Sequence, residues 1–127
     1  MISYNMLDCN FLCSYIPELK EEIYAENEYL GENLPHCLFG NILNPLVVRM
    51  LRKDNFRENP LLIKIFEMYE NLAIYGDMET RNLLQVTLLE YLWDEYLIYS
   101  RAVAMMGGKT REINEYISEY IRKPNKI

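Results

Sequence analysis

Histidine, cysteine and glycine are scarce in this chain, and their scarcity excludes many kinds of catalytic site. The 127 residues include one histidine, three cysteines and five glycines. A di-iron carboxylate site needs a Glu-x-x-His pair from each of two helices, which one histidine cannot supply. Gly107-Gly108-Lys109-Thr110 shares some letters with a phosphate-binding P-loop, but it lacks the leading glycine and the preceding strand.

Disulfide bonds and metal sites are not expected. An odd number of cysteines cannot all pair within one chain, and Cys9 and Cys13, four residues apart on an expected helix, are poorly placed to bridge each other. We therefore expect Cys9, Cys13 and Cys37 to be reduced thiols in a cytoplasm. Together with His36 they offer the atoms for a zinc site, but not the tight CxxC or HxxxH pairs that zinc sites usually have. We predict no metal and no cofactor.

Long hydrophobic runs and an excess of positive charge are missing too. No window approaches the roughly 20 apolar residues of a membrane span, and Asp8 and Asn10 interrupt the first segment, so no secretory signal is visible. Lysine and arginine total 13 against 19 aspartates and glutamates, which gives a net charge of -6. Because non-specific nucleic-acid binding needs a basic surface, direct binding of nucleic acid is not expected. We expect a cytoplasmic protein without a membrane partner.

The composition that remains is that of a globular protein. Half of the residues are hydrophobic and a quarter are charged, which is typical of folded rather than disordered chains. A chain of this length buries roughly two-thirds of the surface that it exposes when unfolded. We expect a single helical domain over residues 1–127, with a short C-terminal tail at about 123–127.

Apolar side chains recur at helical spacing along nearly the whole chain, and no segment alternates as a strand would. Asn59-Pro60 is the clearest helix start, while Gly76 ends one helix and Asp77 caps the next. The segment at about 78–93 is apolar nearly all the way round, which is typical of a helix in the middle of a bundle. We predict an all-α fold, a compact bundle of about six to seven helices around this central helix, which breaks near residues 94–97.

Two further helix boundaries follow from proline, glycine and threonine. Pro45 lies inside a helix expected from about Leu34 to Arg52, where proline breaks or kinks the helix. The pattern fits two short helices as well as one bent helix. Near the end of the chain, the glycine pair at 107–108 predicts a turn, and Thr110 is expected to cap the last helix.

Carboxylates and nucleophiles do not indicate an active site. Glu90 and Glu95 lie among apolar neighbours, so we expect one of them to be partly buried and held by an arginine such as Arg81 or Arg101. A cysteine or serine nucleophile needs a base, and the only histidine, His36, adjoins a cysteine whose side chain points away from it on a helix. We predict that the protein is not an enzyme and has no catalytic residue.

The strongest positive signal is a run of acidic residues. The stretch from Glu18 to Glu32 carries six glutamates and one lysine. Folded as a helix that opens at Pro17 and ends at Gly31, it places an apolar stripe on one side and most of the carboxylates on the other. Carboxylates crowded on an outward face attract a basic partner over distance.

We predict that a protein partner contacts two groups of residues. The first acidic group combines outward glutamates with two tyrosines, because tyrosine brings a large rigid area and one polar handle to an interface. Packing of these tyrosines under a neighbouring helix is an equal alternative. The first acidic group consists of Glu18, Glu21, Glu22, Tyr24, Glu28 and Tyr29. The second acidic group consists of Asp77, Glu79, Asp94 and Glu95.

Several short motifs together resemble a known family. They are Leu34-Pro35-His36 at a helix start, the Gly76-Asp77 junction, the run Asn82-Leu83-Leu84-Gln85-Val86-Thr87-Leu88-Leu89-Glu90, and Met106-Gly107-Gly108-Lys109-Thr110. From about Phe11 to Tyr116 the chain resembles small all-helical bacterial proteins of unassigned activity. These are often candidate immunity proteins of polymorphic toxin systems, including contact-dependent inhibition systems. Glycine at position 108 stands where the family pattern has proline.

The resemblance implies a role but transfers no catalytic residue. It implies a cytoplasmic immunity protein that binds and neutralises a cognate toxin domain by occluding its active or substrate-binding surface. A basic, nuclease-type toxin agrees with the acidic charge, since many such toxins act on nucleic acid. The alternative is a helical adaptor or regulatory module that binds another protein without a toxin partner. The sequence leaves the oligomeric state open.

Overall fold

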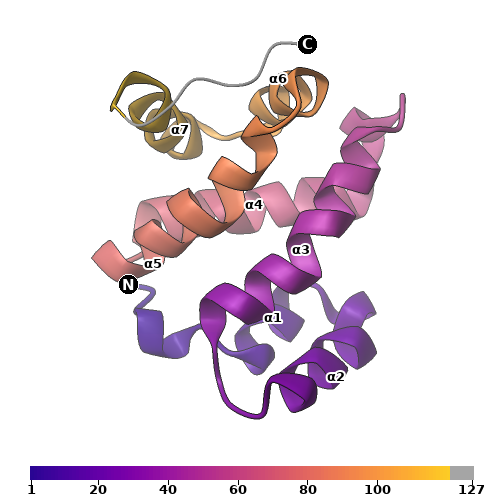
Figure 1. Ribbon diagram of the computed structural model, residues 1–127, viewed down its shortest axis with the longest axis vertical. Coiled ribbons are helices and arrows are strands. Elements are labelled where there is room, and N and C mark those ends of the chain that lie inside the picture. Colours follow the sequence, from indigo (N-terminus) through magenta and orange to yellow (C-terminus); the bar gives the residue numbers. More distant parts are fainter. Residues whose placement is uncertain (121–127) are drawn as a thin grey trace.

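The computed structural model describes residues 1–120, and within them the fold is all-α, as predicted (Figure 1). The predicted tail at 123–127 lies outside the described residues. The elements in chain order are η1 (Tyr4–Met6), α1 (Cys9–Tyr15), η2 (Pro17–Leu19), α2 (Lys20–Leu30), α3 (Pro35–Leu51), η3 (Phe56–Glu58), α4 (Pro60–Tyr75), α5 (Met78–Asn82), η4 (Leu83–Leu89), η5 (Glu90–Trp93), α6 (Tyr96–Met105) and α7 (Gly108–Tyr120). Of these, η4 is a π-helix and the other η elements are short 3₁₀ turns.

Helix starts follow the capping residues that the sequence offers. Asn59 Oδ1 accepts hydrogen bonds from the backbone N–H groups of Leu61 and Leu62 at 3.0 and 3.1 Å, which confirms the predicted start of α4. Asp77 Oδ1 accepts from the Thr80 N–H at 2.9 Å and caps α5. At the end of α2, Gly31 has a φ of 79°, a left-handed conformation that suits glycine because it has no Cβ.

The helices pack into one compact body (Figure 1). The short helices α1 and α2 lie at one end and α6 and α7 at the other, with α3, α4 and the α5–η4 segment between them. One cluster of buried apolar residues joins these elements. Trp93, Tyr69 and Phe39 are its largest fully buried side chains. Trp93 packs edge-on against Tyr99 at 4.9 Å between ring centroids, and its indole N–H donates to Asn114 Oδ1 at 3.1 Å.

The predicted central helix at 78–93 is a continuous helical run, but its winding changes along its length. It begins as α5, widens to the π-helix η4 and tightens to the 3₁₀ turn η5. Its leucines face the core, whereas Val86 and Tyr91 are 42% and 45% exposed, so one side of the run meets solvent. The predicted break follows at Asp94 and Glu95, and α6 then begins at Tyr96.

Pro45 does not divide α3. The helix is continuous from Pro35 to Leu51, so of the two predicted alternatives the single helix is the one observed. Proline has no backbone N–H, and the Asn41 carbonyl therefore lacks the hydrogen bond that residue 45 would otherwise donate. The exposed position of Pro45 places this defect on the solvent side of the helix.

The prediction that Thr110 caps the last helix is wrong. Helix α7 begins at Gly108, so Thr110 lies within its first turn. The cap comes instead from Glu70 on α4, whose carboxylate accepts from the Lys109 N–H at 3.0 Å, the Thr110 N–H at 2.9 Å and the Thr110 hydroxyl at 2.8 Å. A carboxylate is favoured there because a helix N-terminus is the positive end of the helix dipole.

Candidate partner-binding surface

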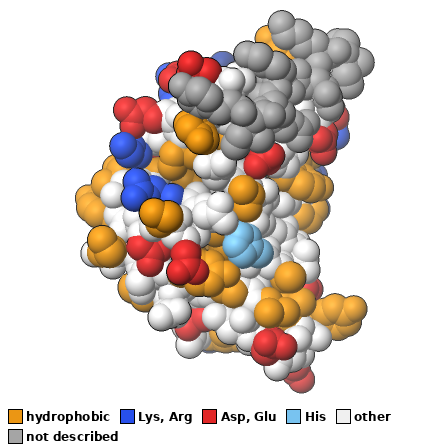
Figure 2. Space-filling model, turned by 60° about the vertical axis from the view of Figure 1, so that its left-hand side comes forward, with side chains coloured by type: hydrophobic (Ala, Val, Ile, Leu, Met, Phe, Trp, Pro, Cys, Tyr) orange, Lys and Arg blue, Asp and Glu red, His pale blue; other side chains and the backbone are white. Residues whose placement is uncertain are grey.

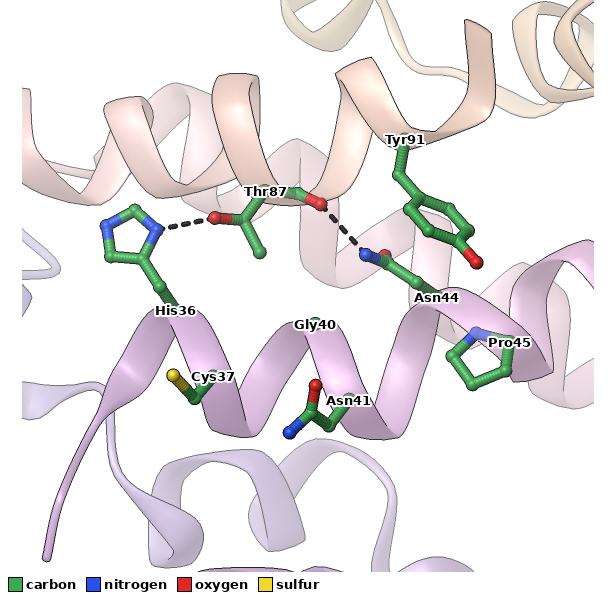
Figure 3. Close-up of a pocket in the computed structure, with 8 residues that line it drawn as sticks. All are labelled: His36, Cys37, Gly40, Asn41, Asn44, Pro45, Thr87 and Tyr91. Carbon is green, nitrogen blue, oxygen red and sulfur yellow. Dashed lines mark hydrogen bonds between the residues drawn. The ribbon is translucent and has the colours of Figure 1, made fainter. Parts of the chain in front are cut away.

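A groove of about 590 Å³ runs between α3 and η4. Figure 2 shows the face that carries the histidine, where hydrophobic and uncharged side chains predominate around it. Figure 3 shows the groove itself, with one wall from α3 and the other from η4 and η5. Its lining residues are His36, Cys37, Gly40, Asn41, Asn44, Pro45, Thr87 and Tyr91.

Thr87 holds the two walls of the groove together. Its hydroxyl and His36 Nδ1 share a hydrogen bond, and its carbonyl oxygen accepts from Asn44 Nδ2 at 2.9 Å (Figure 3). Gly40 allows this close approach, because a Cβ atom there would lie 3.0 Å from Thr87 Cγ2. Thr87 follows His36 by 51 positions and Asn44 by 43 positions in the chain.

Among the described residues, the groove contains one buried acceptor without a donor and one backbone carbonyl without its usual helical donor. Asn44 is only 7% exposed, and its Oδ1 atom is buried without a hydrogen-bond partner. A buried acceptor without a donor lowers the free energy of unfolding by about 1–3 kcal/mol. The Asn41 carbonyl, one turn earlier, lacks its helical donor because of Pro45. The π-helix opposite is itself a form that occurs often at functional sites.

Two smaller hollows continue the groove. A hollow of about 220 Å³ between α2 and α3 shares Asn41 and Pro45 with it and includes Glu22. Another of about 140 Å³ shares Tyr91 with it and includes Asp94 and Glu95. The exposed side of α3 therefore lies between carboxylates from both acidic groups.

The first acidic group has the predicted outward orientation on η2 and α2. Glu18, Glu21, Glu22 and Glu28 are exposed, and Leu19, Ile23 and Leu30 turn inward. Among residues 1–120, no ion pair within 4.0 Å involves Glu21, Glu22 or Glu28.

Glu18 differs from its neighbours because it is paired. Its carboxylate lies 3.0 Å from Lys64 Nζ on α4. A hydrogen bond from its own backbone N–H and the bond from Lys64 lower the pKa of Glu18 below its ordinary value. The pair is exposed on both sides, so its contribution to stability is small.

The two tyrosines of the first acidic group have different surroundings. Tyr24 is 39% exposed, and its hydroxyl donates to Asn10 Oδ1 at 2.8 Å, so it packs partly against the α1 side. Burial raises the pKa of Tyr24, with further contributions from Cys13, Cys9 and Asp8. Tyr29 is 85% exposed and is available to a partner.

The second acidic group is split between the two ends of the run from Met78 to Trp93. The Asp77 carboxylate caps α5 and also accepts a hydrogen bond from the Tyr4 N–H at 3.1 Å. Both of its oxygens therefore already have partners within the protein. Hydrogen bonds from the Thr80 backbone and side chain, and from the Tyr4 backbone, lower the pKa of Asp77. Glu79 is exposed nearby, and its charge adds to burial in raising the pKa of Tyr4. The Tyr4 ring in turn lies beside the His36 ring at one end of the groove, with 6.0 Å between the ring centroids.

At the other end of this run, Glu95 is half-buried and held by an arginine, as predicted for one of Glu90 and Glu95, but the arginine is not one of the two that were named. Glu95 binds neither Arg81 nor Arg101 but accepts two hydrogen bonds from Arg52 on the loop after α3, at 2.8 and 2.9 Å. Arg101 instead donates to the Leu51 and Lys53 carbonyl oxygens, where it closes the end of α3. The sequence missed Arg52 because the two residues are 43 positions apart.

No metal cluster forms within residues 1–120, where no three histidine, cysteine, aspartate or glutamate side chains converge. Cys9 and Cys13 are half-buried and Cys37 is exposed, each as a free thiol. His36 and Cys37 point to different sides of α3, as expected for neighbours on a helix (Figure 3). None of the helices in the described part of the chain has the length and apolar character to cross a bilayer.

The described residues thus form a small all-helical protein. One of its faces carries a groove, and carboxylates border that groove. A family model matches residues 9–123, and the chain belongs to that family, described as a domain of unknown function (DUF7674). The match covers the range of the resemblance found in the sequence, and it agrees with a family of unassigned activity. No curated protein and no solved structure matches the chain.

Proposed function

We propose that this protein is a cytoplasmic immunity protein that binds a cognate bacterial toxin domain and covers its active or substrate-binding surface. The observation that carries the proposal is the open acidic face of α2, where Glu21, Glu22 and Glu28 are exposed beside Tyr29. The resemblance of the sequence to candidate immunity proteins supplies the class of partner. The toxin is expected to be basic and of the nuclease type.

Charge on this face acts mainly on the rate of encounter. Complementary fields raise association rates from about 10⁵–10⁶ M⁻¹s⁻¹ toward 10⁸ M⁻¹s⁻¹ at low salt. Affinity then depends on a few desolvated anchors within an interface of roughly 1,600 Å². Tyr29 suits an anchor, because its ring is exposed and a tyrosine loses little conformational freedom when it is bound.

The test identifies the genes beside this one and uses the toxin domain that the proposal expects one of them to encode. A variant with Glu21, Glu22 and Glu28 changed to Lys is compared with the wild type by stopped-flow association at several salt concentrations. We expect the association rate at low salt to fall about tenfold or more, and its dependence on salt to weaken. The control changes Glu67, Glu115 and Glu119 to Lys, which are exposed on α4 and α7.

An unchanged rate and salt dependence in the α2 variant would remove this face from the interface. Equal losses in both variants would mean that net charge, not the α2 face, governs association. The adaptor alternative is favoured if the neighbouring genes encode no toxin and the protein instead co-purifies with a regulatory or metabolic protein.

A further inference from the structure

The groove between α3 and η4 has the chemistry of an acceptor site. None of its eight lining residues is a lysine, arginine, aspartate or glutamate. The Asn44 Oδ1 atom and the Asn41 carbonyl oxygen both lack a donor that their surroundings would normally supply. A group that donates several hydrogen bonds would satisfy them, whereas a second acceptor would not.

Among the described residues at the borders of the groove, carboxylates outnumber cations by four to two, which favours a positive charge there. The carboxylates are those of Glu22, Glu26, Asp94 and Glu95, and the cations are Arg49 and Arg52. Asn41, at its edge, donates to Glu26 Oε2 at 2.9 Å, which places a carboxylate beside the groove. Beyond Tyr91, the adjoining hollow includes Asp94 and Glu95. Arg52 is the cation of that hollow, and both of its terminal nitrogens already donate to Glu95.

Tyr91 forms a wall that a flat cation can lie against. Its side chain is 45% exposed and extends from η5 toward α3 beside Asn44 and Pro45 (Figure 3). Guanidinium groups stack on tyrosine faces and present up to five N–H donors in one plane. An ammonium group offers a compact charge without that plane, and a neutral amide offers fewer donors.

We infer that this groove receives the guanidinium group of an arginine side chain that a partner protein presents. The guanidinium lies against Tyr91 and donates to the Asn41 carbonyl and to Asn44 Oδ1. Asn44 Oδ1 is covered in the structure, so the side chains at the groove floor rearrange when the donor enters. The inference deepens the proposed function and rests on it for the identity of the partner as a protein.

The test needs no toxin. The tripeptide acetyl-Gly-Arg-Gly-amide is titrated into the isotopically labelled full-length chain, and backbone and side-chain amide resonances are followed by NMR. We expect saturable shifts at His36, Asn41, Asn44 and Thr87. Matched peptides with citrulline or lysine in place of arginine should bind about tenfold more weakly or not at all. Equal binding of the citrulline peptide, or no saturable shift with the arginine peptide, overturns the inference.

A matched pair of variants locates the site. Tyr91→Ala removes the wall and should weaken binding of the arginine peptide about tenfold. Tyr75→Ala is the control, since Tyr75 is 55% exposed on α4 and is not among the groove residues. Equal losses in both variants, or unchanged binding in Tyr91→Ala, would overturn the inference. Thermal unfolding of each variant shows whether its fold is retained.

The two proposals can fail separately. If the arginine peptide binds the groove but charge reversal on α2 leaves toxin association unchanged, the groove assignment stands and the α2 interface falls. If the toxin binds through α2 while the peptide gives no shift, the groove assignment falls and the immunity proposal stands.

Discussion

Glu70 connects two helices that are far apart in the sequence. It lies on α4, yet its carboxylate receives three hydrogen bonds from the first turn of α7. Burial alone would raise the pKa of Glu70, but the bonds from Thr110 and Lys109 outweigh burial and lower it below the ordinary value of 4.5. The charge and the hydrogen bonds thus join α4 to α7 through residues that are 39 and 40 positions apart in the chain.

We predict that Glu70→Gln lowers the free energy of unfolding by about 1–3 kcal/mol, because a glutamine offers one acceptor oxygen and no charge to the α7 N-terminus. Urea denaturation followed by circular dichroism measures the change. Glu67→Gln, which is exposed on the same helix, is the control and should stay within about 0.5 kcal/mol of wild type. Equal stability of the two variants would contradict the assigned cap.

The adjacent glycines 107 and 108 provide a second test of this contact. A Cβ on Gly107 would lie 2.5 Å from Glu70 Cδ and 2.6 Å from Oε1, so alanine there displaces the carboxylate. We expect Gly107→Ala to cost about 1–3 kcal/mol of stability. A Cβ on Gly108 meets no atom within 4 Å, and Gly108→Ala should be neutral or stabilise by up to about 1 kcal/mol. Similar thermal midpoints for both variants would contradict this explanation.

At the scale of elements, α3 carries a proline that its stability does not need. We predict that Pro45→Ala raises the free energy of unfolding by about 1–3 kcal/mol, because alanine restores the hydrogen bond to the Asn41 carbonyl. Pro60→Ala is the control, since Pro60 is the first residue of α4, where proline costs no hydrogen bond. Chemical denaturation compares them, and a loss of stability in Pro45→Ala would mean that contacts of the proline ring outweigh the missing hydrogen bond.

The same substitution links the element to the groove. If the Asn41 carbonyl contributes to arginine binding because Pro45 cannot donate to it, Pro45→Ala should weaken the binding of the arginine peptide while it stabilises the fold. A proline that lowers stability at a binding site is an expected form of the trade-off between stability and function.

Most of the helices could be predicted from the sequence, because their signals are local. Apolar spacing and short capping motifs such as Asn59-Pro60 act within a few residues of each other. The π winding of 83–89 was not predicted, because leucines spaced along a buried run fit an α-helix equally well. The Glu70 cap and the Arg52–Glu95 pair were missed since each joins residues about 40 positions apart.

The acidic face of α2 could be predicted for the same local reason, whereas the groove could not. Its lining comes from α3, η4 and η5, and its chemistry depends on Thr87 and Asn44 facing each other. Pro45 within a helix was a local signal at this site. The sequence pattern alone gave it only the meaning of a break or kink.

At the scale of the whole molecule, three carboxylates make stability depend on pH in the acid range. Hydrogen bonds lower the folded-state pKa values of Glu70 and Glu18 from 4.5 and of Asp77 from 3.8. These groups hold fewer protons when folded than when unfolded, so their contribution is fully present above those values. It is lost as the pH falls below about 4.5 and through the lowered folded-state pKa values.

We therefore predict that the free energy of unfolding is nearly constant between about pH 7 and pH 5 and falls steadily from about pH 4.5 downward. Urea denaturation over this pH range measures it. Glu70→Gln should show a shallower decline than the wild type, because one of the three groups no longer titrates. Parallel curves for the two proteins would show that Glu70 does not contribute to the acid dependence.

Trp93 gives the molecule a built-in optical reporter. It is the only tryptophan in the chain, it is fully buried, and its contacts reach Tyr99 on α6 and Asn114 on α7. Fluorescence excited selectively from tryptophan therefore comes from a single place, where η5, α6 and α7 meet. A red shift of its emission marks water entering that junction, so undocking of α6 and α7 can be timed separately from the loss of helix seen in the far ultraviolet.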